Sequence, residues 1–295
     1  MSQELQKEDL SQYEIRPDII NYDDLREMIP ILDGHPKITS LLMRLLWLDK
    51  CNRIHAAVCD TPGWDVARRL LFEQYKIKLE VEGKSVLENL PEGAFITVSN
   101  HPFGAIDGII LIYLIGQYRP EFKVMVNMIL NRISSMRPNF IAVDPSSSSD
   151  PKKRAVSLSG IRAVLRQLKE GKPIGFFPAG AMSKTTLRHG LQDRQWQETV
   201  LQIIYKAKVP VVPVFFHGRN SWLCNIMGHI CWPLRSLMIP SEMIKKSGKT
   251  VKVTVGEPIS VEKQSEFSNP EALGDYLREK TYELSEKKNE RKRKH

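Results

Sequence analysis

The sequence predicts an α/β protein: a mixed sheet of about seven strands flanked by helices, with an N-terminal helical region that faces a membrane. Three observations predict this fold. Short runs of apolar and β-branched residues recur from residue 77 onward, as is typical of buried strands. Helical patterns separate several of these runs, which favours a sheet with helices on both faces. Before residue 77, apolar residues recur at helical spacing beside basic ones.

Residues 1–76 are expected to form the N-terminal helical region. Acidic residues in an opening turn predict a first helix near Asn21–Ile29. A second helix is expected over Lys37–Arg53, and a third runs over Gly63–Tyr75, directly after a proline. The apolar stripe at 41–48 includes a tryptophan and has basic neighbours, as do helices that lie in a lipid surface. A helix that faces the protein core would show the same stripe, so both interpretations stay open.

Residues 77–262 are expected to form the α/β core. The helices between its strands are predicted at Ile106–Gln117, Arg154–Glu170 and Asp193–Lys206, and Gly171 is a natural end for the second of them. The expected strands are Ile77–Val81, Ala94–Val98, Phe122–Asn127, Phe140–Val143, Pro173–Phe177, Val211–Phe216 and Val251–Val255.

Residues 263–295 are expected to form a C-terminal helix, over Glu271–Lys287, and a basic tail. The whole chain carries a net charge of +9, and this excess attracts anionic partners such as a membrane surface, an acidic carrier protein or nucleic acid. A solvated, frayed end would carry the same charges. The tail contains Lys287, Lys288, Arg291, Lys292, Arg293 and Lys294.

The cysteines and the hydropathy pattern indicate a cellular location. The four cysteines form no C-x-x-C pair and the nearby histidines have no zinc spacing, so we expect no metal site and reduced thiols, as in the cytoplasm. Met1–Asp18 is polar, unlike a signal peptide, and no apolar run approaches the roughly 18 to 20 residues that span a bilayer. The expected location is therefore cytoplasmic and peripheral, on the inner face of the cell membrane.

The segment Ala94–Leu111 carries the main candidate for chemistry. An apolar strand ends just before His101, a turn follows, and Asp107 lies near the start of the next helix. Functional groups of α/β sheets gather at the carboxyl ends of strands. A carboxylate bound to one imidazole nitrogen fixes the tautomer, so the other nitrogen can take a proton from a hydroxyl. Taken alone, a histidine at a strand end is also compatible with a structural hydrogen bond.

Three further strand ends carry polar or turn-forming residues. In Gly175–Lys184, a strand runs into Pro178-Ala179-Gly180, a turn that could offer backbone N–H groups to an oxyanion or phosphate. Val209–Ser221 has two prolines in an apolar strand and ends in His217-Gly218-Arg219-Asn220. Val251–Ile259 closes in Gly256-Glu257-Pro258. Each of these could equally be plain sheet structure.

The order and spacing of these blocks resemble the glycerolipid acyltransferases related to 1-acylglycerol-3-phosphate acyltransferase. The matching blocks are NHPFGAID, FIAVDP, FFPAGAMS, VPVVPVFFHG and VGEPI, within residues 86–260. The resemblance implies an acyltransferase core at 77–262 that uses an acyl carrier protein or coenzyme A thioester as co-substrate, with no cofactor and no metal. It implies that His101 is the general base and that Asp107 orients it. The substrate-binding residues that it implies are Asn100, Phe103, Gly104, Pro178, Ala179, Gly180, Lys184 and Arg219.

Departures from the family pattern affect the acceptor. Five residues, not four, separate His101 from Asp107. Ala179, Ala181 and Met182 stand where the family has Glu, Thr and Arg, residues associated with binding the acceptor's glycerol phosphate. The sequence is similar to a hemolysin-like branch whose members acylate N-acylated amino-acid lipids. This resemblance implies a lyso-lipid acceptor of the lyso-ornithine or lyso-glycine type.

Other functions remain as alternatives. The enzyme could be a 1-acylglycerol-3-phosphate acyltransferase of phospholipid synthesis, or the chain could be a non-catalytic peripheral lipid-binding protein. A hydrolase is disfavoured because the sequence has no G-x-S-x-G elbow. No nucleic-acid partner is expected, because the basic tail lacks interleaved aromatic residues and no recognised binding motif is present.

Overall fold

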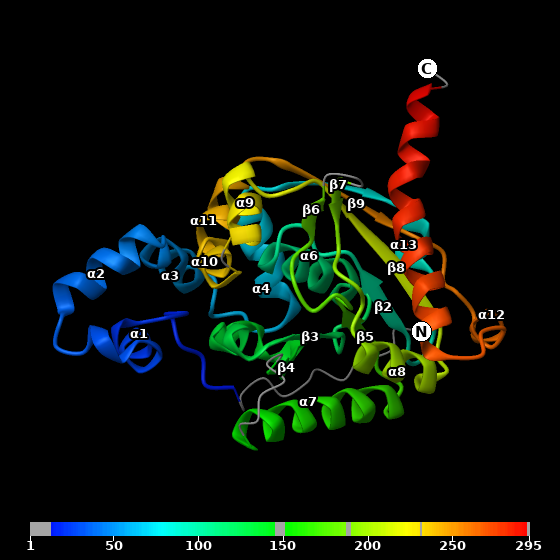
Figure 1. Cartoon of the computed structure of the whole chain (residues 1–295), viewed down its shortest axis with the longest axis horizontal. Coiled ribbons are helices and arrows are strands. Elements are labelled where there is room, and N and C mark those ends of the chain that lie inside the picture. The colour runs from blue at the N-terminus through cyan, green and yellow to red at the C-terminus, as the bar shows by residue number, and fades with distance from the viewer. Residues whose placement is uncertain (1–12, 145–150, 187–189, 231, 294–295) are drawn as a thin grey trace.

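The computed structural model describes residues 13–144, 151–186, 190–230 and 232–293. A central sheet is covered by helices on both faces, and a group of N-terminal helices projects from one side of this body (Figure 1). The sheet has the seven strands that the sequence predicts, so the predicted α/β fold class is confirmed.

The strand order brings the candidate segments to neighbouring positions. Adjacent strands are parallel except for β8 and β9, which are antiparallel. Consequently β2, β5 and β8 lie side by side with their carboxyl ends at one edge of the sheet, called the catalytic edge below. In spatial order the strands are β1 (Lys78–Glu82), β9 (Thr250–Val255), β8 (Val211–His217), β2 (Ile96–Ser99), β5 (Ile174–Phe176), β3 (Lys123–Asn127) and β4 (Phe140–Val143).

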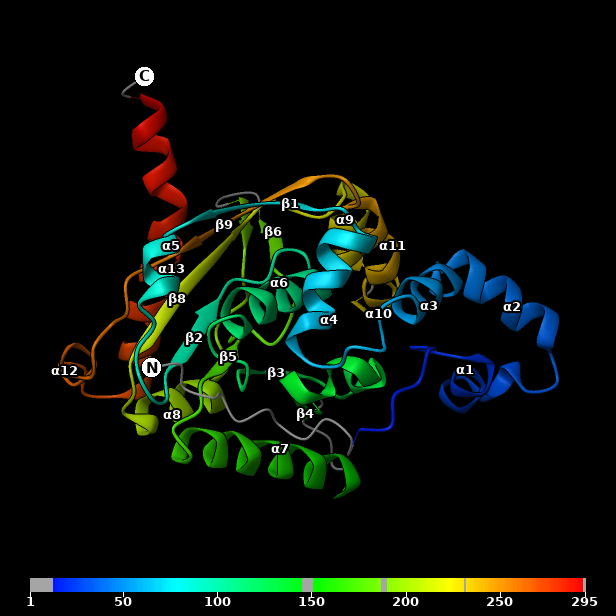
Figure 2. The same ribbon diagram turned by 180° about the vertical axis from the view of Figure 1, so that it is seen from behind.

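Each face of the sheet has its own apolar cluster. The cluster on one face joins the strands to α4 (Trp64–Arg69), the π-helical turn η3 (Leu70–Gln74) and α6 (Ala105–Gly116). The cluster on the other face joins them to α7 (Pro151–Lys169), α8 (Glu198–Ala207) and α13 (Pro270–Arg293) (Figure 2). Burial of apolar surface on both faces, at roughly 25 cal/mol per Å², is the main force that holds the layers together.

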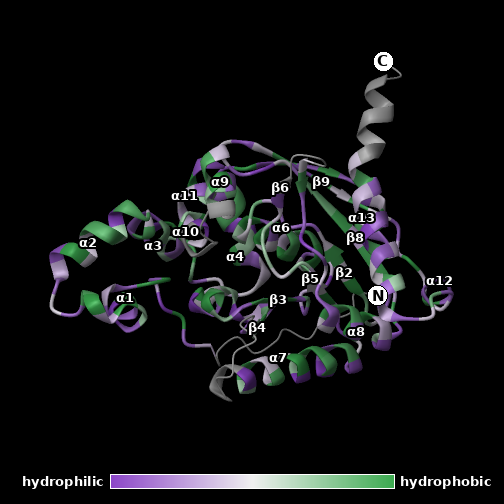
Figure 3. Ribbon diagram, in the orientation of Figure 1, coloured by the Kyte–Doolittle hydropathy of each residue, from purple (hydrophilic) through white to green (hydrophobic). Residues whose placement is uncertain are grey.

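Helix α6 lies in the middle of its layer. Its sequence AIDGIILIYLIG is apolar on nearly all sides, as expected for a helix that is buried all round. Gly116 allows close packing, because a Cβ at this position would lie 2.5 Å from Cβ of Trp64 in α4. Figure 3 shows hydrophobic residues along the central strands and α6, whereas hydrophobic and hydrophilic residues alternate along α7.

The N-terminal region contains α1 (Tyr22–Met28), η2 (Pro30–Leu32), α2 (Pro36–Leu45) and α3 (Leu48–Ala56). The prediction of a single helix over 37–53 is wrong. The helix is interrupted at Trp47, whose backbone is left-handed with a φ of 64°. One face of α2 packs into a small cluster with α1, as the core-facing interpretation expects, while Ile38, Leu41 and Leu45 are exposed. Contact with a lipid surface stays a prediction.

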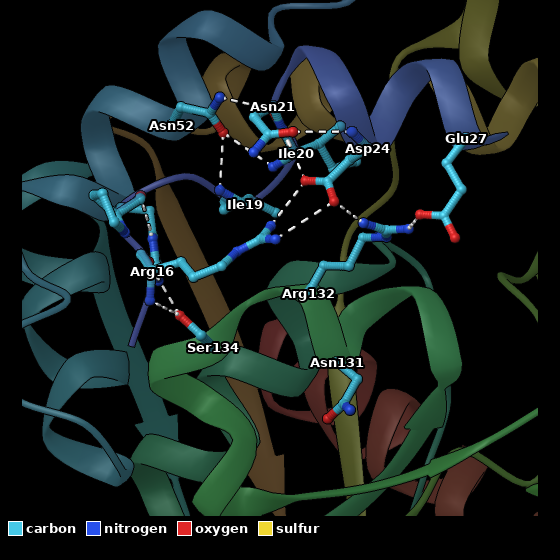
Figure 4. Close-up of polar contacts among 12 residues, drawn as sticks. Arg16, Ile19, Ile20, Asn21, Asp24, Glu27, Asn52, Asn131, Arg132 and Ser134 are labelled. Atoms are coloured by element: carbon cyan, nitrogen blue, oxygen red, sulfur yellow. Dashed lines mark hydrogen bonds and ion pairs between the residues drawn. The ribbon is translucent and has the colours of Figure 1, made fainter. Parts of the chain in front are cut away.

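A polar network attaches this region to the core (Figure 4). The buried carboxylate of Asp24 accepts hydrogen bonds from Arg16, at 2.8 Å, and from Arg132. Arg132 belongs to η4 (Met128–Arg132), and Ser134, in η5 (Ser134–Asn139), exchanges two hydrogen bonds with the backbone of Arg16. The side chain of Asn52 binds the backbone of residues 19 and 20. The region is therefore docked by this polar network together with apolar contacts, since Cys51 lies in the large apolar cluster of the core and Ile19 and Ile54 pack against it.

Several elements differ from the sequence predictions. The helix expected from residue 193 begins five residues later, as α8, because β6 (Lys184–Thr186) and β7 (Gly190–Gln192) form a hairpin just before it. The connection from β8 to β9 contains helices that were not predicted: α9 (Trp222–Ile230), α10 (Trp232–Leu237) and α11 (Ile239–Lys245). The remaining short helices are α5 (Lys84–Glu88) and α12 (Val261–Gln264).

The C-terminal helix was predicted, and α13 packs against α8 and β8. The basic cluster at 287–294 lies outside the residues whose side chains the structure describes. Within the described part of the chain, no helix is both long and apolar enough to cross a bilayer.

Candidate active site

The catalytic edge collects three of the sequence blocks. Strand β2 leads into Asn100 and His101, β5 leads into Pro178, and β8 ends at His217. Because these three strands are parallel neighbours, the residues that follow them meet at one place. The fourth block is different, since β9 runs in the opposite direction and its carboxyl end lies at the other edge.

His101 and Asp107 form a close pair. Gly104, with a φ of 90°, turns the chain between them and directly precedes α6. Asp107 is the third residue of this helix, and its Oδ2 accepts hydrogen bonds from the amides of Phe103 (2.9 Å) and Gly104 (3.1 Å). The same oxygen lies 3.0 Å from Nδ1 of His101. The turn therefore accommodates the fifth intervening residue and still joins the two side chains.

The two side chains of this pair differ in their exposure to solvent. The side chain of Asp107 is fully buried, and burial raises the pKa of its carboxyl, while His101 and the two backbone amides oppose this rise. The side chain of His101 is 19% exposed although its Nδ1 is buried. No hydrogen bond joins its Nε2 to any residue that the structure describes. The imidazole can therefore keep a proton on Nδ1 and accept another at Nε2.

The environment of the imidazole is aromatic. The ring of Phe177, directly after β5, lies 4.2 Å from the His101 ring between centroids, at an angle of 32°. Phe103 is buried, and a Cβ at Gly218 would lie 2.7 Å from its ring, so the β8 end packs closely on it. Nζ of Lys246 lies 4.4 Å from the centre of the Phe103 ring.

Asn100 connects two strands. Its Nδ2 donates to the carbonyl of Phe216 (3.0 Å) and its Oδ1 accepts from the amide of the same residue (2.7 Å). The side chain is buried and extends the pairing of β2 with β8 by one step. Asn100 thus holds the strand end from which His101 projects.

The Pro178-Ala179-Gly180 turn lies beside the pair. Pro178 and Ala179 are buried, and Gly180 has a φ of 63° that suits glycine. The Gly180 amide donates to the carbonyl of Phe177 at 2.9 Å. The amides of residues 103 and 104, on the other side of the pair, are engaged by Asp107 and are already hydrogen-bonded.

Met182 forms an apolar wall over the pair. Its sulfur would lie 2.9 Å from a Cβ at Gly104, so the thioether packs on the turn between His101 and Asp107. Met182 and Ala179 are both buried. This part of the site presents apolar atoms where an arginine and a glutamate are expected in the glycerolipid family.

Lys184 and Arg219 lie at the margins. Lys184 is on β6, and partial burial and the nearby Arg194 and Arg235 lower the pKa of its amine. Arg219 is exposed after β8, and its carbonyl accepts a hydrogen bond from Lys246 at 2.8 Å.

Comparison with known proteins identifies the family. A family model described as an acyltransferase matches residues 30–290. The chain belongs to this acyltransferase family.

This acyltransferase has relatives in two bacteria. It is 28% identical over 256 residues to a lyso-glycine lipid O-acyltransferase of Bacteroides thetaiotaomicron, with 84% of this chain and 89% of the relative covered. It is 30% identical over 217 residues to the protein of the same name from Phocaeicola vulgatus, with 70% and 73% covered. The membership confirms the enzyme class expected from the sequence, an O-acyltransferase.

A solved structure was also found. It is that of the 1-acyl-sn-glycerophosphate acyltransferase PlsC from Thermotoga maritima, at 18% identity and a TM-score of 0.48. The alignment covers 92% of this chain and 90% of that one.

The candidate site also contains residues that sequence reasoning missed. Oδ1 of Asp193 accepts hydrogen bonds from the backbone amide of His101 (3.2 Å) and from the hydroxyl of Ser183 (2.6 Å). Arg235 is 1% exposed and donates to backbone carbonyls of the segment that follows Gly180. The sequence gives no signal for Asp193, which lies 92 positions from His101 and was assigned to a helix. Ser183 ends a block that carried the resemblance and could have been included.

Proposed function

We propose that the protein O-acylates a lyso-lipid whose head is an N-acylated amino acid, of the lyso-glycine or lyso-ornithine type. The acyl donor is an acyl carrier protein or coenzyme A thioester. The observation that carries this proposal is the His101–Asp107 contact of 3.0 Å at the catalytic edge, with the second imidazole nitrogen unengaged among the described residues. The acceptor is supported by the names of the two bacterial relatives and by the apolar wall of Ala179 and Met182.

The geometry is suited to general base catalysis. Asp107, whose Oδ2 lies 3.0 Å from Nδ1, orients His101, and Nε2 removes the proton of the acceptor hydroxyl while the oxygen attacks the thioester carbonyl carbon. The tetrahedral intermediate collapses, the C–S bond breaks, and the leaving thiolate takes the proton from the imidazolium. General base catalysis of this kind contributes on the order of 10²–10⁴-fold. The thioester is already activated, so the proposed reaction needs no metal, cofactor or covalent acyl-enzyme.

The proposed location is cytoplasmic and peripheral, on the inner face of the cell membrane. Exposed Leu41 and Leu45 on α2, near Lys37 and Arg44, support contact with an anionic lipid surface. Each basic residue near such a surface contributes about 1 kcal/mol. High salt should therefore release part of the protein from anionic vesicles, and complete indifference to salt would contradict the electrostatic contribution.

An acceptor assay tests the proposed reaction. Purified protein receives acyl carrier protein or coenzyme A thioesters together with N-(3-hydroxyacyl)glycine, N-(3-hydroxyacyl)ornithine or 1-acylglycerol-3-phosphate, and mass spectrometry detects the new ester. We expect transfer to the 3-hydroxyl of an amino-acid lipid and none by the His101→Ala variant. Exclusive transfer to 1-acylglycerol-3-phosphate would show that the proposed acceptor is wrong and that the enzyme acts in phospholipid synthesis. Vesicle binding without any transfer would favour a non-catalytic lipid-binding protein.

A further inference from the structure

Helix α9 exposes apolar side chains next to the catalytic edge. Trp222 is 73% exposed, Leu223 45% and Ile226 42%, and Leu237 at the end of α10 is 42% exposed. Cys224 and Asn225, on the opposite side of α9, are buried. The orientation of the helix is thus fixed, with one apolar face left without a partner among the described residues.

This face is joined rigidly to the active site. Asn220, two residues before α9, donates to the carbonyl of Phe103 at 3.1 Å. The amide and hydroxyl of Ser221 both donate to the buried carboxylate of Glu242, at 2.8 and 2.7 Å. Helix α9 also packs beside β6, which follows the Pro178-Ala179-Gly180 turn. The exposed residues therefore belong to a helix that is held close to the turn after His101.

The charges around α9 favour one kind of partner. Residues 217–252 contain six lysines and arginines and a single acidic residue, Glu242. Glu242 is buried and bound by Ser221 and Lys245, so it presents little charge to solvent. Arg219, Lys245 and Lys249 are exposed. A positive surface with exposed tryptophan, leucine and isoleucine complements an anionic lipid membrane, where the indole ring prefers the interface.

We propose that α9 is a lipid-contact helix, which inserts Trp222, Leu223 and Ile226 into an anionic membrane beside the active site. It is a second contact besides α2, and it lets the acceptor reach His101 at the lipid surface. This inference rests on the proposed function, since only a lipid acceptor requires a site that opens at a membrane.

Fluorescence quenching tests the insertion directly. The wild-type protein is mixed with phosphatidylglycerol–phosphatidylcholine vesicles that contain brominated acyl chains, and tryptophan emission is recorded. We expect quenching that falls clearly in Trp222→Phe, which keeps an apolar ring but removes the fluorophore. Unchanged quenching in this variant would overturn the proposal.

A triple variant tests the energetic contribution. Trp222→Gln, Leu223→Gln and Ile226→Gln together should weaken vesicle binding about tenfold or more, because three apolar side chains lose their burial in lipid. The matched control is Leu158→Gln with Leu165→Gln on α7, two apolar residues that are each 48% exposed but lie on a helix that covers the other face of the sheet from α6 (Figure 1). Equal losses in the two variants would contradict a specific role of α9.

Comparing two acceptor forms separates this inference from the proposed function. The ratio of transfer rates with vesicle-borne and detergent-dispersed acceptor should fall in the α9 triple variant and stay constant in the α7 control. If wild-type protein transfers no acyl group in either form, the proposed function fails. If it transfers but the ratio does not change, the inference about α9 fails alone.

A second observation, independent of the first, concerns the backbone of His101. Its amide donates to Oδ1 of Asp193 (3.2 Å), and its carbonyl accepts from the amide of Ser183 (2.9 Å). The Ser183 hydroxyl donates to the same Oδ1 at 2.6 Å. These three hydrogen bonds, among His101, Ser183 and Asp193, are called the clamp below. Asp193 is 6% exposed and lies between β7 and α8.

The clamp is anchored from two other helices. The Asp193 amide donates to the hydroxyl oxygen of Tyr282 in α13, at 2.8 Å. The guanidinium of Arg235, in α10, donates to the carbonyls of Met182 (3.2 Å) and Ser183 (2.7 Å). The backbone of His101, which follows β2, is thus held by the segment between β7 and α8 and, through it and Ser183, by α13 and α10.

We infer that Asp193 is a positioning residue, which fixes the main chain of His101 so that the imidazole meets Asp107 and the acceptor. Oδ2 of Asp193 has no partner among the described residues. An asparagine can therefore replace the side chain and keep the accepting oxygen, whereas alanine removes it.

The two substitutions give the test. Asp193→Ala should lower kcat about tenfold or more with KM within about twofold, because a small misplacement of a catalytic group is costly. Asp193→Asn should recover most of kcat, and Arg194→Ala, at the exposed neighbouring position, serves as control. Thermal unfolding shows whether each variant is folded. If the Asp193→Asn and Asp193→Ala variants lose the same fraction of kcat at equal stability, the clamp does not position His101.

Discussion

The catalytic edge and the N-terminal region are held in different ways. At the edge, His101 is bound through its side chain, its amide and its carbonyl, above large apolar clusters on both faces of the sheet. Among the described residues, the N-terminal region has a separate cluster of four buried apolar residues, and it is attached by the network around Asp24 (Figure 4) and by Cys51, which reaches the large apolar cluster. The position of the edge therefore depends on extensive packing, whereas that of the N-terminal region depends on a polar network and fewer apolar contacts. Disturbing each region should produce a different kind of loss.

His101→Ala should give the largest effect. Removing the proposed general base should lower kcat by on the order of 10²–10⁴-fold. The side chain is partly exposed and contacts mainly Asp107 and Phe177, so the fold should persist. Rate measurements with circular dichroism check this. A variant that unfolds, or one that retains the wild-type rate, would contradict the role of His101.

Gly104→Ala should combine a loss of stability with a loss of activity. A side chain at a φ of 90° is strained by about 1–3 kcal/mol, and the new Cβ would press on the sulfur of Met182. Because the Gly104 amide binds Asp107, we expect the strain to reach His101 and lower kcat about tenfold. Gly171→Ala is a matched control, with a φ of 76° but no atom within 4 Å of the new Cβ. It should lose stability and keep kcat.

Asp24→Asn should affect the other region. Losing charge-assisted hydrogen bonds to Arg16 and Arg132 should cost about 2 kcal/mol locally. Hydrogen exchange should rise in α1 and α3 while α6 stays protected. Asp23→Asn is the control, since that side chain is 82% exposed and should change exchange little. Equal exchange in both variants would mean that Asp24 does not dock the region.

The same carboxylate gives a pH dependence. Burial by itself raises the pKa of Asp24, but the hydrogen bond from Arg16 and the charge of Arg132 hold the pKa below its ordinary value. Its stabilisation is therefore present above the ordinary pKa of about 4 and is lost as the pH falls through the lower folded value. The difference in exchange between wild type and Asp24→Asn should shrink below about pH 4, and a constant difference would contradict the assignment.

Leu41→Gln with Leu45→Gln should have the smallest effect on the fold. Both side chains are exposed, so the free energy of unfolding should change by less than about 0.5 kcal/mol per site. Binding to anionic vesicles should weaken, since α2 would lose part of its apolar face. Co-sedimentation with the vesicles measures this binding, and unchanged binding would show that α2 does not contribute to membrane contact.

The sequence predicts the seven strands well because each is a short run of apolar and β-branched residues, continuous in most strands and alternating with polar residues in β1 and β9. The His101–Asp107 contact is also predictable, since only a turn separates the two. The break at Trp47 is not predictable, because a left-handed residue other than glycine leaves no pattern. Asp193 could not be found, since its contact with His101 depends on a hairpin that brings distant segments together.

The antiparallel return from β8 to β9 has a consequence for how this enzyme can diversify. Because β8 ends and β9 begins at the same end of the sheet, helices α9 to α11 form an insertion between two neighbouring, hydrogen-bonded strands. Lengthening or exchanging this insertion would leave the pairing of β8 with β9 intact. The exposed face of α9 can therefore vary, whereas Arg235 of α10 must keep its hydrogen bonds to the carbonyls of Met182 and Ser183 beside His101.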